Sequence, residues 1–485
     1  MQNNFTLSPS LRVKHLKKSI AVILVGLIAI FATYHSYKPM PEGMVHSGSK
    51  FPAQEVEFLG DNSWISEIGD RELEQEIFDS IFELIGGARE LIVINMFLYN
   101  DFQGPKPETH RLLSSELTSA LIAQKSAYPN IEIVVITDAL NTVYGGLKSE
   151  YFEKMRGVGI KVVETDLTRL RDSNPAYSWF WRLFVQPFGN SPGGFFPNPL
   201  GEGKVSVRSY LELANFKANH RKTIVADTQD GYAGLVTSAN PHDGSSAHRN
   251  IAIRFSGAAA IDLLRTENAA LTMSGHAPVS LPPLTPPQKA DLSVQIVTER
   301  AIKAAVLNQL NSMGEGDHID LIMFYLSDKD IIRALIDAKE RGAEVRVLLD
   351  PNKDAFGHEK DGVPNRPVAS ILHNHGLSIR WANVDGEQSH SKMLLALPEQ
   401  KDAVIIAGSA NYTRRNLKNL NMETNVVVTG SSDAEAIKEA KDYFDASWGN
   451  EEGRVYSLPY SAYADDSLLK RLKSDFMEVS GISTF

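Results

Sequence analysis

Two short polar segments recur in this chain, and their repetition is the feature that most restricts how it can fold. His220-Arg221-Lys222 returns as His390-Ser391-Lys392, 170 residues later (390 − 220). Ser238-Ala239-Asn240 returns as Ser409-Ala410-Asn411 after 171 residues (409 − 238). Two linked motifs repeated at nearly the same interval predict one folding unit present twice, with both copies contributing to a single site.

The residue types in each copy suit a phosphate group. In an extended strand, residues i and i+2 point to the same face, so the histidine and lysine of each segment project together. Each copy then offers an imidazole, an ammonium, a hydroxyl and an amide to one small space. Such a set matches an oxyanion with several oxygen atoms.

A metal site is the main competing interpretation of paired histidines. A lysine on the same face of each strand would repel a divalent cation, and the chain contains no cysteine. The sequence therefore predicts no metal and no cofactor. A chance His-x-Lys pair at a strand edge is the other alternative, and the repetition argues against it.

Strand and helix patterns alternate on both sides of residue 290, which predicts an α/β protein made of two homologous halves. In the first half the patterns predict helices over 71–85, 113–124 and 148–156 and strands over 91–97, 131–137 and 160–163. In the second they predict helices over 301–310 and 329–341 and strands over 319–325, 345–349 and 376–380.

Composition shifts divide the chain further. The predicted parts are a basic segment 1–18, an apolar helix 19–37, a Pro/Gly/Ser-rich linker 38–54, the first half 55–277, a connector 278–290 with five prolines, the second half 291–460 and a tail 461–485. Proline at that density excludes a helix or a central strand from the connector.

The uncharged run from Ser19 to Tyr34 is about 24 Å long as a helix, slightly shorter than the ~30 Å hydrocarbon core of a bilayer. We favour an uncleaved membrane anchor over a cleaved signal peptide, and both over a buried core helix. The preceding basic residues favour a cytoplasmic N-terminus and an extracytoplasmic body, in a bacterial periplasm or at a cell surface.

The first half contains an insertion, 167–215, that the second half lacks. From Leu167 to Lys222 there are eight basic and three acidic residues, with an aromatic cluster over 177–184. Two interpretations stay open: contact with an anionic lipid surface, or a lid packed on the protein's own core. The net charge of −10 opposes binding to nucleic acid.

From about residue 55 to 450 the chain resembles the phospholipase D superfamily, whose hallmark is two His-x-Lys-x4-Asp motifs. The first motif is complete in His220, Lys222 and Asp227, whereas the second has Leu397 in place of the aspartate. The resemblance implies two halves, each a mixed β-sheet flanked by helices, with the active site at the pseudo-two-fold interface.

The resemblance also implies a two-step displacement at phosphorus. One histidine of the pair forms a phosphohistidine, and the other protonates the leaving alcohol and then activates water or a second alcohol. The remaining predicted site residues hold phosphate oxygens or support the motifs; they are Lys222, Lys392, Asn240 and Asn411, with Asp227, Ser238 and Ser409 in supporting roles.

Roles for the two histidines follow from their expected partners. Counting back seven residues from Gly257 and Gly430 gives Asn250 and Glu423. A carboxylate favours the protonated imidazole, so we expect His390 with Glu423 to be the general acid and His220 with Asn250 to be the nucleophile. The alternative is that both partners only cap strand ends. His242 and His248 are expected to be solvated loop residues.

These features predict a membrane-associated phosphodiesterase of phospholipids that catalyses head-group hydrolysis or phosphatidyl transfer, like cardiolipin synthases. Its expected partners are a phospholipid substrate and the membrane surface, with no nucleic acid and no obligate protein partner. The alternative is an exported, metal-independent nuclease of the same superfamily. A degenerate phosphate-binding module is disfavoured because histidine and lysine are intact in both motifs.

Overall fold

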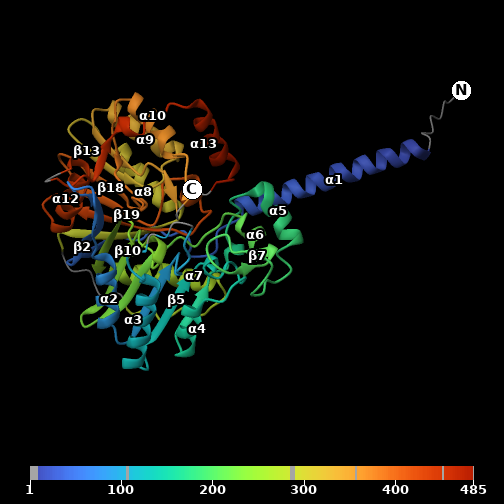
Figure 1. Cartoon of the computed structure of the whole chain (residues 1–485), viewed down its shortest axis with the longest axis horizontal. Helices are drawn as coiled ribbons and strands as arrows, with labels where there is room; N and C mark the ends of the chain where they lie inside the picture. The colour runs from blue at the N-terminus through green and yellow to red at the C-terminus, as the bar shows by residue number, and fades with distance from the viewer. Residues whose placement is uncertain are drawn as a thin grey trace.

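The computed structural model describes residues 9–104, 107, 109–283, 290–355, 358–450 and 453–483. Two mixed β-sheets form the body of the molecule, and one long helix projects from it (Figure 1). The predicted α/β architecture with two related halves is confirmed.

The first half contributes an eight-stranded sheet. Its strands lie in the order β3 (Arg71–Glu74), β2 (Val56–Ile65), β11 (Asn250–Ser256), β10 (Gly231–Thr237), β9 (Lys222–Thr228), β4 (Leu91–Met96), β5 (Glu132–Thr137) and β6 (Lys161–Glu164). Strands β4, β5 and β6 are parallel to one another, whereas the other neighbouring pairs are antiparallel.

The second half contributes a nine-stranded sheet. Its order is β1 (Phe51–Ala53), β12 (Leu292–Thr298), β20 (Thr424–Gly430), β19 (Ala403–Gly408), β18 (Lys392–Leu397), β13 (His318–Met323), β14 (Glu344–Leu349), β17 (Ser378–Ala382) and β21 (Ser457–Pro459). From β12 to β17 this repeats the order from β2 to β6, with the parallel strands at the same end.

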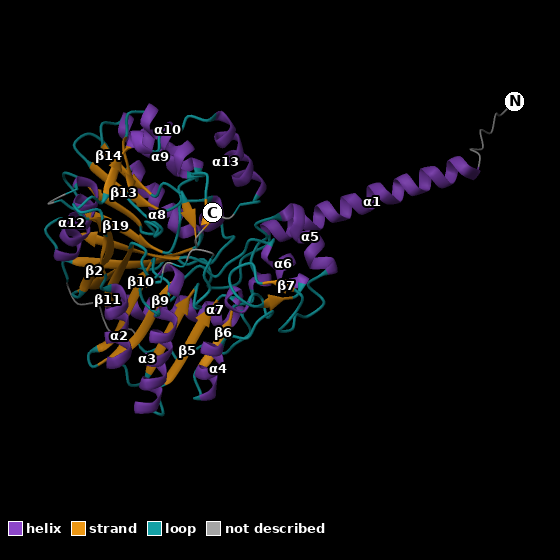
Figure 2. Ribbon diagram, in the orientation of Figure 1, coloured by secondary structure: helices purple, strands orange, loops and turns teal. Residues whose placement is uncertain are grey.

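Helices cover the outer faces of both sheets (Figure 2). Helices α2 (Ile77–Gly87), α3 (Leu113–Ala127) and α4 (Glu150–Gly157) pack on the first sheet, and α8 (Arg300–Asn311), α9 (Lys329–Glu340) and α10 (Asn365–Asn374) on the second. The inner faces share one apolar core with α7 (Ala258–Met273) and α12 (Glu435–Gly449). Central strands such as β4 are therefore apolar on both faces.

The predicted helix over 71–85 is wrong in its first half. Residues 71–74 form β3, which pairs with β2, and α2 starts only at Ile77. The Asp61 carboxylate accepts hydrogen bonds from the backbone N–H groups of Glu76 and Ile77, at 2.9 and 3.1 Å, and so satisfies the start of the helix. Asp61, which lies 15 residues before Glu76, fixes the start of α2, so the apolar periodicity of the helix could not reveal where the helix begins.

The prediction of a linker over 38–54 is also wrong. Strand β1 pairs with β12, Met44 is fully buried, and Thr298 bonds both Met44 and His46. Proline and glycine here shape a packed segment of irregular backbone rather than a tether.

The tail contains the helix α13 (Leu468–Ser480), and residues 284–289 of the proline-rich connector lie outside the described residues.

Helix α1 (Pro9–Tyr37) leaves the body beside the insertion (Figure 1). Its segment Lys14–Tyr37 is long and apolar enough to cross a membrane, about 36 Å at the helical rise, and none of it is buried. An N-terminal helix of this kind is consistent with a membrane anchor or a signal sequence. The insertion folds into α5 (Pro175–Phe184), β7 (Phe196–Pro197), β8 (Lys204–Val205) and α6 (Val207–Leu213).

Candidate active site

The two motif histidines lie where the halves meet. His220 lies two residues before the start of β9, and His390 lies two residues before the start of β18. The backbone N–H of His220 donates to Met422 O of the second half, at 2.9 Å, and that of His390 donates to Arg249 O of the first half, also at 2.9 Å. Each histidine is thus held by backbone from the opposite half.

The structure exchanges the predicted histidine partners. Nδ1 of His220 lies 3.0 Å from the Glu423 carboxylate, and Nδ1 of His390 lies 3.1 Å from Oδ1 of Asn250. The predicted pairs, His390 with Glu423 and His220 with Asn250, are therefore wrong. The pseudo-two-fold packing places the start of β20 beside the start of β9, and the start of β11 beside the start of β18.

Burial dominates the protonation of this site. It lowers the pKa of His220 to about 4, although the neighbouring Glu423 carboxylate opposes that shift. Burial also holds the pKa of His390 well below its ordinary value, and the charge of Lys392 lowers it further. For Glu423, burial favours protonation, but His220 and Lys222 outweigh it and keep the pKa below its usual value. At neutral pH both rings are neutral and Glu423 is ionised.

Serine and asparagine side chains orient the two partners. Ser409 Oγ donates to the Glu423 carboxylate at 2.5 Å, and the amide of Asn416 donates to its other oxygen. Ser238 Oγ donates to Oδ1 of Asn250 at 2.9 Å. The two motif serines thus lie behind the histidine partners, in equivalent places in the two halves.

The motif lysines are buried with the histidines. Lys222 Nζ donates to His220 O at 2.7 Å, and Lys392 Nζ donates to His390 O at 2.5 Å. Burial lowers the pKa of Lys222 to about 7 and holds that of Lys392 well below its usual value. An anionic ligand beside these ammonium groups would favour their charged forms.

Two phenylalanines that sequence reasoning missed line the site. The Phe97 ring lies 4.8 Å from the His220 ring and 5.0 Å from Lys222 Nζ. In the second half, Phe324 lies 4.9 Å from His390 and 5.1 Å from Lys392 Nζ. Met96-Phe97 and Met323-Phe324 end equivalent strands, and this repeated pair of residues was the available signal.

The motif asparagines lie on the turns after β10 and β19. Oδ1 of Asn240 accepts from the backbone N–H of Leu98 at 3.2 Å, which directs its NH2 group elsewhere. Oδ1 of Asn411 is buried and has no hydrogen-bond partner among the described residues. Neither NH2 group donates a hydrogen bond among the described residues, so both can donate to a ligand.

Two aspartates also escaped the sequence analysis as site residues. Asp138 follows β5 and accepts from the backbone N–H of Asn219 at 2.6 Å, while Asp350 follows β14 and accepts from that of Ser389 at 2.8 Å. Each carboxylate holds the residue that precedes a motif histidine. Burial raises the pKa values of Asp138 and Asp350, to about 7 and about 6.

The expectation that His242 and His248 are solvated is wrong. Both are buried, and the ring of His248 lies 5.9 Å from that of His390. His242 bonds Phe102 O through Nε2 at 2.7 Å and Ser245 through Nδ1. The loop after Asn240 is held at the interface between the halves, where Arg249 pairs with Ser389 in a parallel bridge.

Known proteins resemble this chain in sequence and in fold. Residues 306–448 match the family model described as "Cardiolipin synthase, PLD-like domain". No curated protein sequence matches the chain. Among the solved structures that match is a phosphatidylserine synthase from Haemophilus influenzae Rd KW20, with 10% identity over 89% of this chain and 96% of that chain and a TM-score of 0.52. A polyphosphate kinase from Porphyromonas gingivalis matches with 16% identity over 79% of this chain and 46% of that chain, at a TM-score of 0.44. The phospholipase D family member Nuc from Salmonella typhimurium matches with 19% identity over 35% of this chain and 98% of that chain, at a TM-score of 0.28.

The likeness to the synthase shows the fold, and the family match covers the half that contains His390 and Lys392. Residues 306–448 belong to the phospholipase D-like domain family. Residues 306–448 are a phospholipase D-like phosphodiesterase or phosphatidyltransferase domain, and the resemblance found in the sequence is confirmed.

The phospholipase D motif aspartate supports the first motif. Asp227 accepts hydrogen bonds from the backbone N–H groups of Arg89, Glu90 and Leu91, at 2.8 to 3.1 Å, and so joins β9 to the start of β4. The site is held by this carboxylate at the strand end remote from His220.

The second motif keeps an equivalent link despite Leu397. In the second sheet Leu397 pairs with His318, just as Asp227 lies opposite the start of β4. Here the linking carboxylate lies just before β13: Asp317 accepts a hydrogen bond from the backbone N–H of Glu399, just after β18, at 3.0 Å. Leu397 itself packs against the central core.

This difference predicts unequal costs for removing the two carboxylates. Asp227→Ala should lower the free energy of unfolding by about 3 kcal/mol, because three amides lose charge-assisted bonds at a mostly buried site. Asp317→Ala should cost about 1 kcal/mol, since that residue is half-buried. Leu397→Asp should not raise activity, because Asp317 already provides the link. Denaturant unfolding measures the first two, and an equal cost for both would contradict the assignment.

Proposed function

We propose that this protein is a membrane-associated phosphodiesterase that acts on phospholipids through a phosphohistidine intermediate. The observation that carries the proposal is the pair of buried imidazoles whose Nδ1 atoms are held by a carboxylate and an amide from opposite halves. This leaves Nε2 of each ring to react with a phosphate. The reaction is head-group hydrolysis or phosphatidyl transfer.

The first chemical step forms a bond between His220 Nε2 and phosphorus. The phosphorus–oxygen bond of the leaving alcohol breaks, and His390 donates its proton to that oxygen. In the second step His390 takes a proton from water or an acceptor alcohol. The oxygen so activated attacks phosphorus, and the nitrogen–phosphorus bond breaks to release neutral His220.

The observed partners of His220 and His390 are the reverse of those expected from the sequence, so the nucleophile and general-acid roles now have a different physical reason. A pKa of about 4 keeps His220 neutral and nucleophilic at pH 7. Once phosphorylated, its ring carries a positive charge in a buried site, and Glu423 beside Nδ1 offsets that charge. His390 has only the neutral amide of Asn250, so in this mechanism the anionic substrate must raise the pKa of His390 before the ring carries the proton that it donates.

Cationic and amide groups surround the reacting phosphate in this proposal. Lys222 and Lys392 supply positive charge, and the NH2 groups of Asn240 and Asn411 donate to the non-bridging oxygens. Ser238 and Ser409 do not contact the phosphate; they orient Asn250 and Glu423 by hydrogen bonds. Asp227 supports the first motif.

Two kinds of observation support a lipid substrate. The matching family model names cardiolipin synthase, and the solved structure with the same fold is a phosphatidylserine synthase. Helix α1 is long enough to span a bilayer, and the basic residues Lys14, Lys17 and Lys18 near its start favour a cytoplasmic N-terminus. We therefore place the body on the extracytoplasmic side of the membrane.

The substrate class can be tested with the full chain in detergent micelles. Phosphatidylglycerol, phosphatidylcholine and single-stranded DNA are incubated with it, with and without EDTA. We expect turnover of a phospholipid that EDTA leaves unchanged, and loss of more than about 10³-fold in His220→Asn. Cleavage of DNA alone would refute the lipid substrate, and loss of activity in EDTA would refute the metal-independent mechanism.

The two histidine roles can be separated by trapping the intermediate. With a phosphodiester whose leaving group needs no protonation, His390→Asn should accumulate a phosphoenzyme, because attack by His220 persists while water is no longer activated. His220→Asn should accumulate none. Intact-protein mass spectrometry after an acid-free quench detects the adduct. An adduct found on His220→Asn instead would reverse the roles.

The low pKa of His220 predicts an unusual pH profile for phosphoenzyme formation in His390→Asn. Protonation blocks attack, so the second-order rate constant should stay flat from about pH 6.5, where Lys222 is charged, down to pH 5 and decline only near pH 4. A histidine with an ordinary pKa would lose about thirtyfold at pH 5. Because Glu423 raises the pKa of His220, Glu423→Gln should move the decline to lower pH while slowing the reaction about 10²-fold. A decline centred near pH 6.5 would contradict this assignment.

A further inference from the structure

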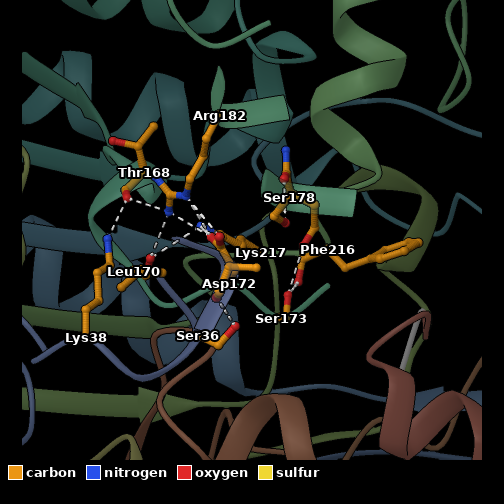
Figure 3. A network of polar contacts seen from close by, with 12 residues as sticks. Ser36, Lys38, Thr168, Leu170, Asp172, Ser173, Ser178, Arg182, Phe216 and Lys217 are labelled. Carbon is orange, nitrogen blue, oxygen red and sulfur yellow. Dashed lines mark hydrogen bonds and ion pairs between the residues drawn. The ribbon is translucent and has the colours of Figure 1, made fainter. Parts of the chain in front are cut away.

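The C-terminal end of α1 is fixed to the body by hydrogen bonds (Figure 3). The backbone N–H of Asp172 donates to His35 O at 3.0 Å. Lys38 Nζ donates to Thr168 O at 3.0 Å, and Arg171 Nε donates to Lys38 O at 2.8 Å. The helix and the insertion therefore meet directly, with no flexible linker between them.

A buried ion cluster secures this junction. Asp172 accepts three hydrogen bonds from Arg182, at 2.7 to 3.1 Å, and lies 2.5 Å from Lys217 Nζ (Figure 3). All three side chains are almost fully buried, and burial lowers the pKa of Lys217 to about 8. Lys217 precedes His220 by three residues, so the cluster links the foot of α1 to the active-site segment.

A rigid junction constrains which surface faces the bilayer. If α1 spans a membrane, its last turn ends at the interface, and side chains beside that turn lie at the same level. The insertion lies there, with α5 packed against α1 (Figures 1 and 2). Its surface is therefore membrane-proximal.

This membrane-proximal surface is unusually apolar. Phe195 is 96% exposed, and further exposed apolar residues lie on α5 and in the loop after it: Phe180, Leu183, Phe184, Phe188 and Phe196. The interpretation of the aromatic cluster as a lid packed on the core fails for these side chains, although Trp181 is buried. Exposed aromatic rings of this kind suit the boundary between head groups and acyl chains.

Helix α13 adds a second apolar surface. Its exposed residues fall within one arc of the helix: Leu468, Leu469, Leu472, Phe476 and Val479, with Leu469 78% exposed. The opposite face holds the helix to the body, since Glu478 accepts from Ser327 Oγ and from the N–H of Arg414, both at 2.8 Å. The helix lies at the edge of the body on the side from which α1 projects (Figure 1).

We propose that the exposed apolar side chains of the insertion and of α13 form a docking surface that sits in the interfacial zone of the bilayer entered by α1. The proposal rests on the retention of α1 as an anchor. The lipid surface is favoured over a second protein because a fixed membrane helix already holds the insertion against the bilayer, and because an amphipathic helix beside it suits the same plane.

The absence of cysteine makes the proposal testable with single labels. Phe195→Cys and Phe476→Cys each carry an environment-sensitive fluorophore on the full chain, reconstituted in vesicles of phosphatidylethanolamine and phosphatidylglycerol. Leu24→Cys in α1 reports on the anchor, and Ile68→Cys, 84% exposed in the turn between β2 and β3, is the matched control. Lipids with a nitroxide near the head group or deep in the chain act as quenchers.

We expect the head-group nitroxide to quench labels 195 and 476 several-fold more than label 68, and the deep nitroxide to quench label 24. Phe184→Cys and Leu472→Cys should repeat the result. Quenching at 24 with none at 195 and 476 would overturn the docking surface and leave the anchor intact. No quenching at 24 would overturn the anchor on which it rests. Neither result depends on enzymatic activity, so the proposed reaction is tested separately.

Discussion

The site depends on two short parallel bridges that cross between the halves. Asn219 pairs with Met422, and Arg249 pairs with Ser389. A motif histidine follows one residue of each bridge, and its Nδ1 partner follows the other. Glu423 therefore lies beside His220, and Asn250 lies beside His390, so each imidazole and its partner come from different halves. Neither half can assemble a complete set alone. The duplicated sequence thus specifies one shared site.

These bridges also bury an unusual amount of charge, which the interface must compensate. Arg221, between His220 and Lys222, is fully buried and donates to Glu299 at 2.9 Å. Glu299 in turn accepts from the backbone N–H of Glu423. A buried cation without such partners would cost several kcal/mol. The second half therefore places Glu299 behind the reactive face, where its bond to the backbone N–H of Glu423 helps to hold Glu423 beside His220.

Sequence patterns predicted the two α/β halves and the paired motifs because those features are local or repeated. The imidazole partners were assigned within each half, since counting along one strand cannot reveal which residue lies across an interface. Asp138 and Asp350 each follow a predicted strand, but their bonds to Asn219 and Ser389 are tertiary and leave no local pattern. The supposed linker was misjudged for a similar reason: proline and glycine mark irregular backbone, and only packing shows whether it is buried.

In the proposed reaction a two-fold site acts on an asymmetric substrate, since a phospholipid has acyl chains on one side of its phosphate and a head group on the other. The asymmetry is added around the site rather than within it. Only the first half carries the insertion, and Lys217 in its buried ion cluster lies three residues before His220. Because that cluster also holds the C-terminal end of α1, the direction of α1 is fixed relative to His220. The unequal halves therefore give the proposed lipid substrate two different surroundings, one on each side of its phosphate, while the reacting groups stay paired.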